Sequence, residues 1–163
     1  MTAFEFIRSV FPKIRTEYEE LLIEQTDIIL HKLKFIDAED RPHVHIKKSS
    51  IHFTAGQNSL LNSLIQIAGG IPIEDSLEAD LLLLPQKDGD WVYDFDAISR
   101  DLSISTSKAY RDNQLYFIKE KALDASTETK LLASLETLAE IIQPQYFVYG
   151  REGEDWIKFS LNF

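Results

Sequence analysis

An alternation of apolar and polar side chains between Trp156 and Phe163 constrains the fold of this chain more than any other feature. Apolar residues occupy positions 157, 159, 161 and 163, and polar residues lie between them. Because side chains on a strand point alternately to opposite faces, this segment is predicted to be a half-buried strand. With Tyr146–Tyr149 as a second arm and the charged turn Arg151–Asp155 between them, it predicts a C-terminal β-hairpin.

The first 36 residues instead show helical periodicity, with apolar side chains three or four residues apart. These are Phe4, Ile7, Phe11, Ile14, Tyr18, Leu21 and Ile28. Pro12 has no amide proton, so it either kinks this helix or begins a second one. This apolar stripe could form a heptad seam that pairs with a partner helix, or it could pack the helix on the protein's own sheet. The sequence favours the second interpretation.

Two more hairpins are predicted in the middle of the chain. His43–Ile46 and Ile51–Thr54 flank a tight turn at 47–50. Leu81–Leu84 and Trp91–Phe95 flank a proline followed by an Asp-Gly pair, which is a turn signal because glycine tolerates a positive φ.

Two further amphipathic helices complete the prediction. One is capped by Gln57 or Asn58 and stops at Gly69-Gly70; the other begins near Ser126 and ends before Pro144. Strands and helices follow one another without a strand–helix–strand rhythm. The sequence therefore predicts a single α+β domain over residues 1–163, with an antiparallel or mixed sheet and helices packed on one face.

The chain contains no cysteine, which fits a reducing compartment and excludes thiolate catalysis, Cys-ligated zinc and iron–sulfur clusters. Glu5 and Arg8 interrupt the first apolar stretch, so it does not read as a signal peptide. The longest apolar run, Leu81–Leu84, is far too short to span a membrane. We expect a soluble, cytoplasmic protein.

Acidic residues are concentrated in the middle of the chain. The net charge is −10, and residues 74–96 hold eight acidic side chains against one lysine. Such a field repels nucleic acid and attracts basic proteins. We therefore expect a non-catalytic protein-binding module, of the inhibitor or immunity type, that neutralises a basic partner such as a nuclease toxin. The candidate contact residues are Asp88, Asp90, Trp91, Tyr93, Asp94 and Asp96.

Residues 95–111 resemble a helix-turn-helix, which makes a DNA-binding regulator the alternative function. Phe95, Ile98 and Leu102 would form the inner face of the first helix, residues 103–105 the turn, and residues 106–111 the start of a recognition helix. The DNA contacts would be Ser105, Thr106, Lys108 and Arg111. Against this, residues 91–122 hold five acids and five bases, and DNA binding needs a basic footprint.

Metal binding and catalysis have weaker support. His43 and His45 share one face of a strand, and His45 would lie opposite His52 in the first predicted hairpin, which makes the three weak candidates for a metal site. No nucleophile elbow, phosphate-binding loop or dinucleotide fingerprint is present, so no catalytic residue and no cofactor are predicted. An enzyme of unrecognised chemistry is the second alternative.

Overall fold

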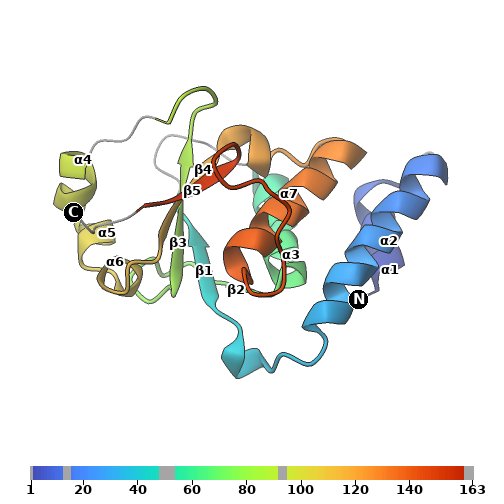
Figure 1. Ribbon diagram of the computed structural model, residues 1–163, viewed down its shortest axis with the longest axis horizontal. Helices are drawn as coiled ribbons and strands as arrows, with labels where there is room; N and C mark the ends of the chain where they lie inside the picture. Colours follow the sequence, from blue (N-terminus) through green and yellow to red (C-terminus); the bar gives the residue numbers. More distant parts are fainter. Residues whose placement is uncertain (1, 13–15, 48–53, 92–94, 160–163) are drawn as a thin grey trace.

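The computed structural model describes residues 2–12, 16–47, 54–91 and 95–159, and it has the α+β organisation that the sequence predicts (Figure 1). The helices are α1 (Ala3–Val10), α2 (Thr16–Leu33), α3 (Ala55–Ile67), α4 (Phe95–Arg100), α5 (Leu102–Ser105), α6 (Lys108–Arg111) and α7 (Glu128–Ile142), with short 3-10 helices η1 (Ala38–Asp40) and η2 (Glu120–Leu123). No helix in these ranges is both long and apolar enough to cross a membrane.

The sheet is mixed and has the strand order β2-β1-β3-β4-β5. Its strands are β1 (His43–Ile46), β2 (Ile71–Pro72), β3 (Leu81–Gln86), β4 (Leu115–Lys119) and β5 (Trp156–Phe159). The first four are parallel, and β5 runs antiparallel to β4. Residues Leu81–Leu84 form a continuous apolar run because β3 lies between two parallel neighbours with both faces covered.

Helices cover both faces of the sheet, whereas the sequence predicted them on one. Helices α3 and α7 pack on one face together with Val44, Leu83 and Ile118. The short helices α4, α5 and α6 cover the other face, where their apolar side chains meet Leu82 and Phe117. The expectation of one covered face was therefore too simple, because alternate residues of β3 are buried on opposite sides.

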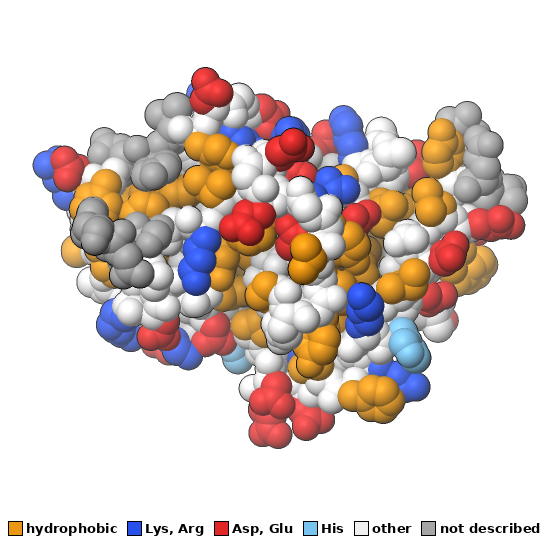
Figure 2. Space-filling view, in the orientation of Figure 1, with side chains coloured by type: hydrophobic (Ala, Val, Ile, Leu, Met, Phe, Trp, Pro, Cys, Tyr) orange, Lys and Arg blue, Asp and Glu red, His pale blue; other side chains and the backbone are white. Residues whose placement is uncertain are grey.

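The N-terminal helices form a third layer, and Pro12 separates α1 from α2 as predicted. Helix α2 packs on α7 and α3 and not on the sheet, which corrects the sequence-based interpretation. Its buried side carries Leu22, Ile29 and Leu33, whereas Leu21 and Ile28 are exposed. Figure 2 shows hydrophobic side chains on the surface over these helices. Helix α2 thus has two apolar faces, and part of the predicted stripe lies on the outer one.

The first predicted hairpin is wrong, because β1 pairs with the parallel strands β2 and β3. Residues 48–53 lie outside the described residues, and Thr54 caps α3 through a capping box with Gln57. Helix α3 ends at Ile67, just before the predicted stop at Gly69-Gly70, and Gly69 has a φ of +100°. The adjacent Gly70 packs so closely that a Cβ there would lie 2.9 Å from Val44 Cγ2.

The two other predicted hairpins are also wrong. Strand β3 pairs with β1 and β4, and Phe95 begins α4. The 146–149 segment forms no strand, and β5 pairs with β4 instead. The strand prediction itself is confirmed for residues 156–159; residues 160–163 lie outside the described part. In each case turn chemistry marked a change of direction without identifying the strand's partner.

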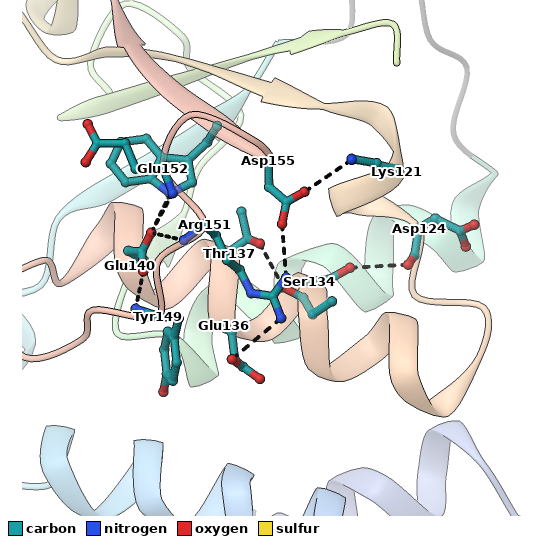
Figure 3. A network of polar contacts seen from close by, with 12 residues as sticks. Lys121, Asp124, Ser134, Glu136, Thr137, Glu140, Tyr149, Arg151, Glu152 and Asp155 are labelled. Carbon is teal, nitrogen blue, oxygen red and sulfur yellow. Dashed lines mark hydrogen bonds and ion pairs between the residues drawn. The ribbon is translucent and has the colours of Figure 1, made fainter. Parts of the chain in front are cut away.

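A buried carboxylate on α7 holds the segment that precedes β5 (Figure 3). Glu140 is 5% exposed, and its carboxylate accepts hydrogen bonds from the backbone N–H groups of Tyr149, Arg151 and Glu152. It also accepts one from Trp156 Nε1, at 2.9 Å. Buried charge is tolerated only when it is well satisfied, and here four donors satisfy it. Glu140 thereby links α7 to the start of β5.

Replacing Glu140 with glutamine should test this link. The amide keeps the shape, but it removes the charge and turns an N–H donor toward other donors. We expect Glu140→Gln to lower the free energy of unfolding by about 2–3 kcal/mol, measured by urea denaturation. Glu136→Gln, one turn earlier, removes only an ion pair to Arg151 at 3.6 Å and should cost roughly 1 kcal/mol or less. Equal losses in the two variants would contradict the assignment.

Candidate functional site

The chain changes winding direction between β1 and β3. After β1, the chain passes through α3 to β2 on one side; after β3, it passes through α4–α6 to β4 on the other side. The two connections lie on opposite faces of the sheet. In open sheets of parallel strands, ligands bind outside the carboxyl ends of the strands at such a switch point. A ligand site is therefore expected at this edge of the sheet.

A pocket of about 420 Å³ lies at the carboxyl end of β1, between α3 and the end of β2. Its volume is in the range of small-molecule sites. Strand β2 pairs with His43 and Val44 only, so the pocket wraps the part of β1 that β2 does not reach. The lining comprises the apolar Val44, Ile46, Leu61, Ile65, Pro72 and Ile73 and the polar His45, Lys47, Asn58, Asn62 and Glu74.

Three polar side chains of this pocket are available to a ligand. Asn58 and Asn62 lie one turn apart on α3, so they share a helix face. Neither amide has a hydrogen-bond partner among the described residues, and neither does the exposed carboxylate of Glu74. An apolar floor with a few convergent polar groups is the usual composition of a small-ligand site.

The other two polar residues of the pocket are held by the protein. His45 Nδ1 lies 2.9 Å from the carbonyl oxygen of Ile73. Because a carbonyl only accepts, Nδ1 is the donor of this hydrogen bond. Lys47 Nζ donates to Ser103 Oγ and lies 3.4 Å from Asp101 Oδ2.

The Lys47 contacts tie β1 to α5 across the sheet edge. The pKa of the Asp101 carboxyl is lowered by the hydrogen bond from the Ser103 hydroxyl and by the nearby Lys47 charge. Together they outweigh partial burial, which would raise this pKa. Asp101 therefore stays ionised, caps α5 by accepting from Ser103 N, and keeps its attraction for Lys47. This cluster fixes one wall of the switch point.

Of the predicted contact residues, Asp88, Asp90 and Trp91 follow the carboxyl end of β3 and Asp96 lies on α4; Asp88 and Trp91 have structural roles. Asp88 accepts from Lys121 N at 3.0 Å. Trp91 Nε1 donates to Gly153 O at 2.7 Å, and Lys119 Nζ lies 4.0 Å from the centre of its ring. Asp90 and Asp96 are exposed, while Tyr93 and Asp94 lie outside the described residues. The acidic stretch is also divided, because Asp80 lies at the opposite, amino-terminal edge.

The 95–111 segment forms three short helices, with α5 covering the residues predicted to be the turn. Ile98 is buried as predicted, whereas Leu102 is 71% exposed and does not belong to an inner face. Of the predicted DNA contacts, Ser105 closes α5, Thr106 Oγ1 donates to Leu102 O, Lys108 pairs with Asp80, and Arg111 donates to Thr106 O. The helical arrangement differs from the predicted one, and DNA binding itself stays a prediction.

The histidines do not converge on a metal site in the described residues. His43 lies beside Asp80, with its Nδ1 3.3 Å from Oδ2, while His45 is held by Ile73. His52 lies outside the described part of the chain.

Sequence reasoning missed Asn58, Asn62 and Glu74 as site residues. A signal was available in the two asparagines four residues apart on a helix that follows a strand, but they belong to no motif. Glu74 joins them only because β2 runs parallel to β1, and the predicted hairpin placed no parallel strand there.

No known protein family matches this chain, and no curated protein matches it. Among solved structures, an ABC transporter substrate-binding protein from Listeria monocytogenes EGD-e matches 86% of this chain with a TM-score of 0.59 and 12% identity. An ABC transporter solute binding protein from Sulfurospirillum deleyianum DSM 6946 covers 90% of the chain at 13% identity, with a TM-score of 0.48. This chain spans 62% and 51% of their respective lengths. The similarity to the first of these structures shows only that the two proteins share a fold.

The Asp80 cluster at the amino-terminal edge predicts a pH dependence of stability. Partial burial would raise the pKa of the Asp80 carboxyl, but hydrogen bonds from His43 N, Lys108 and the His43 ring outweigh it and lower the pKa. A lowered folded-state pKa contributes stability above the ordinary value near 3.8, and this is lost as pH falls through the folded pKa. Urea denaturation at several pH values should show Asp80→Asn less stable than wild type at pH 7, with a gap that shrinks below pH 4.

Lys108→Met is the matched control for this experiment, since it removes one donor and keeps the backbone bond from His43 N, at 2.8 Å. Its pH dependence should lie between those of wild type and Asp80→Asn. Parallel curves for wild type and Asp80→Asn would contradict the assignment.

Proposed function

We propose that this chain is a non-catalytic ligand-binding module whose site is the pocket at the carboxyl end of β1. The observation that carries the proposal is the position of this pocket beside the switch point, where the amides of Asn58 and Asn62, without a partner among the described residues, lie over an apolar floor. The likeness in fold to a protein named as substrate-binding supports a binding role. The absence of cysteine supports work in a reducing compartment such as the cytoplasm.

The lining indicates the chemistry of the ligand. The two amides both donate and accept hydrogen bonds, and the Glu74 carboxylate accepts them and attracts positive charge. Leu61 and Ile65 offer apolar surface beneath. A small organic molecule with amide, hydroxyl or amine groups on an apolar body fits this set.

A fragment screen followed by NMR mapping tests the proposal. Amide shift changes should cluster at β1, at Asn58 and Asn62, and at Glu74. Asn62→Trp should fill the pocket and weaken binding of any hit at least about tenfold, because most of a ligand's contact surface is lost. Gln66→Trp, one turn later on α3 and outside the lining, should leave binding unchanged. Hits that map elsewhere, or equal effects of both variants, would overturn the assignment.

We also propose a second function, the binding of a basic protein to the acidic loop after β3. The exposed side chains of Asp90, in this loop, and of Asp96, on the following α4, favour it in a chain of net charge −10. In this role the protein would be an inhibitor that neutralises its basic partner. The first experiment is affinity capture of the protein's partners from native lysate at two salt concentrations.

Charge reversal tests the acidic surface once a partner is captured. Asp90→Lys with Asp96→Lys should slow association several-fold and flatten its salt dependence, because the loop would no longer steer the partner. Glu39→Lys with Asp40→Lys makes the same change of net charge on the exposed η1 and is the control. Stopped-flow rates that respond equally to both pairs would show that net charge, and not this loop, directs the encounter.

A further inference from the structure

Helix α2 exposes an apolar stripe on the side opposite to its buried face. Leu21, Ile28 and Phe35 follow one another at seven-residue spacing and are 45%, 40% and 82% exposed. Seven residues are close to two helical turns, so the first two lie on one line along the helix, and Phe35 follows just beyond its end at Leu33. A shallow, open depression over the middle of this face includes Ile28 and the neighbouring Glu24 and Asp27. The three side chains give α2 an apolar line along its outer side.

The charges beside the stripe are segregated along the helix. Exposed acids (Glu20, Glu24 and Asp27) lie before or beside Ile28, and exposed basic or titratable groups (His31, Lys32 and Lys34) lie after it. In Figure 2, acidic side chains lie toward the upper end of α2, and basic and histidine side chains lie toward its lower end. The helix dipole favours acidic residues in the first turn of a helix and basic residues in the last turn, and its effect does not extend to the middle. It does not account for Glu24 and Asp27, which lie mid-helix.

We propose that the outer face of α2 binds the same face of a second copy of this chain, antiparallel, about a two-fold axis near Ile28. In that arrangement Ile28 meets its own copy, and Leu21 approaches Phe35 of the second copy. The acidic half of each helix lies against the basic half of the other, with Glu24 opposite Lys32. A parallel arrangement would place like charges together, which is unfavourable.

The dimer leaves the proposed ligand pocket open. Helices α3 and α7 separate α2 from the sheet, whereas the pocket lies at the carboxyl end of β1. The inference therefore does not rest on the proposed function, and either can fail without the other.

Sedimentation equilibrium of the full chain over a range of micromolar concentrations tests the dimer. We expect a monomer–dimer equilibrium that weakens at least about tenfold in Ile28→Asp, because a charge would lie at the centre of the interface. Leu21→Asp is a second variant should the first fail to fold by circular dichroism. Leu102→Asp, which changes an exposed leucine on α5, should leave association unchanged. A monomer at every concentration, or a dimer unaffected by both α2 variants, would overturn the proposal.

A charge swap tests the antiparallel register. Glu24→Lys alone, and Lys32→Glu alone, should each weaken self-association, because each places like charges opposite one another twice. An equimolar mixture of the two variants should form a heterodimer, since one ion pair is then restored in its original sense and the other in reversed sense. Failure of the mixture to associate better than either variant would refute this register.

Discussion

The carboxylate of Glu140 is the interaction on which the rest of the structure most depends. It gathers three backbone N–H groups and an indole N–H at one point on α7. This holds the 149–152 segment and positions Trp156 for the start of β5, which in turn covers the free edge of β4. Arg151, bound to Glu136 and Asp155, adds a second layer of charge around the same turn. Because such a group is costly to bury without partners, the loop and the helix order each other.

The parallel part of the sheet then determines where a ligand can bind. Connections on opposite faces diverge between β1 and β3, and the short β2 leaves space beside α3 that a longer strand would fill. The Lys47–Asp101 pair supports this edge from the α5 side. The pocket is thus a product of topology, assembled from residues that share no motif.

Elements with strong periodicity could be predicted from the sequence, but their partners could not. The break at Pro12, the end of α3 just before Gly69 and the strand that begins at Trp156 follow from local chemistry, and all are present. The three hairpins were wrong because turn residues such as Gly89 indicate reversal of direction and carry no information on distant pairing. The uninterrupted Leu81–Leu84 run was the available sign of a parallel strand buried on both faces. The amides of Asn58 and Asn62 were missed because their role arises only once β2 and α3 lie together.

The position of Glu140 also bears on the order in which the chain can fold during synthesis. Its last partner, Trp156, lies sixteen residues further along the chain. Adding those residues takes about one to a few seconds; until residues 149–152 are in place the carboxylate lacks its backbone donors, and the indole donor comes last. The full set of four donors exists only once Trp156 has emerged from the ribosome. A chain stopped before Tyr149 would expose this acidic helix face, a feature by which quality-control factors could tell an unfinished molecule from a complete one.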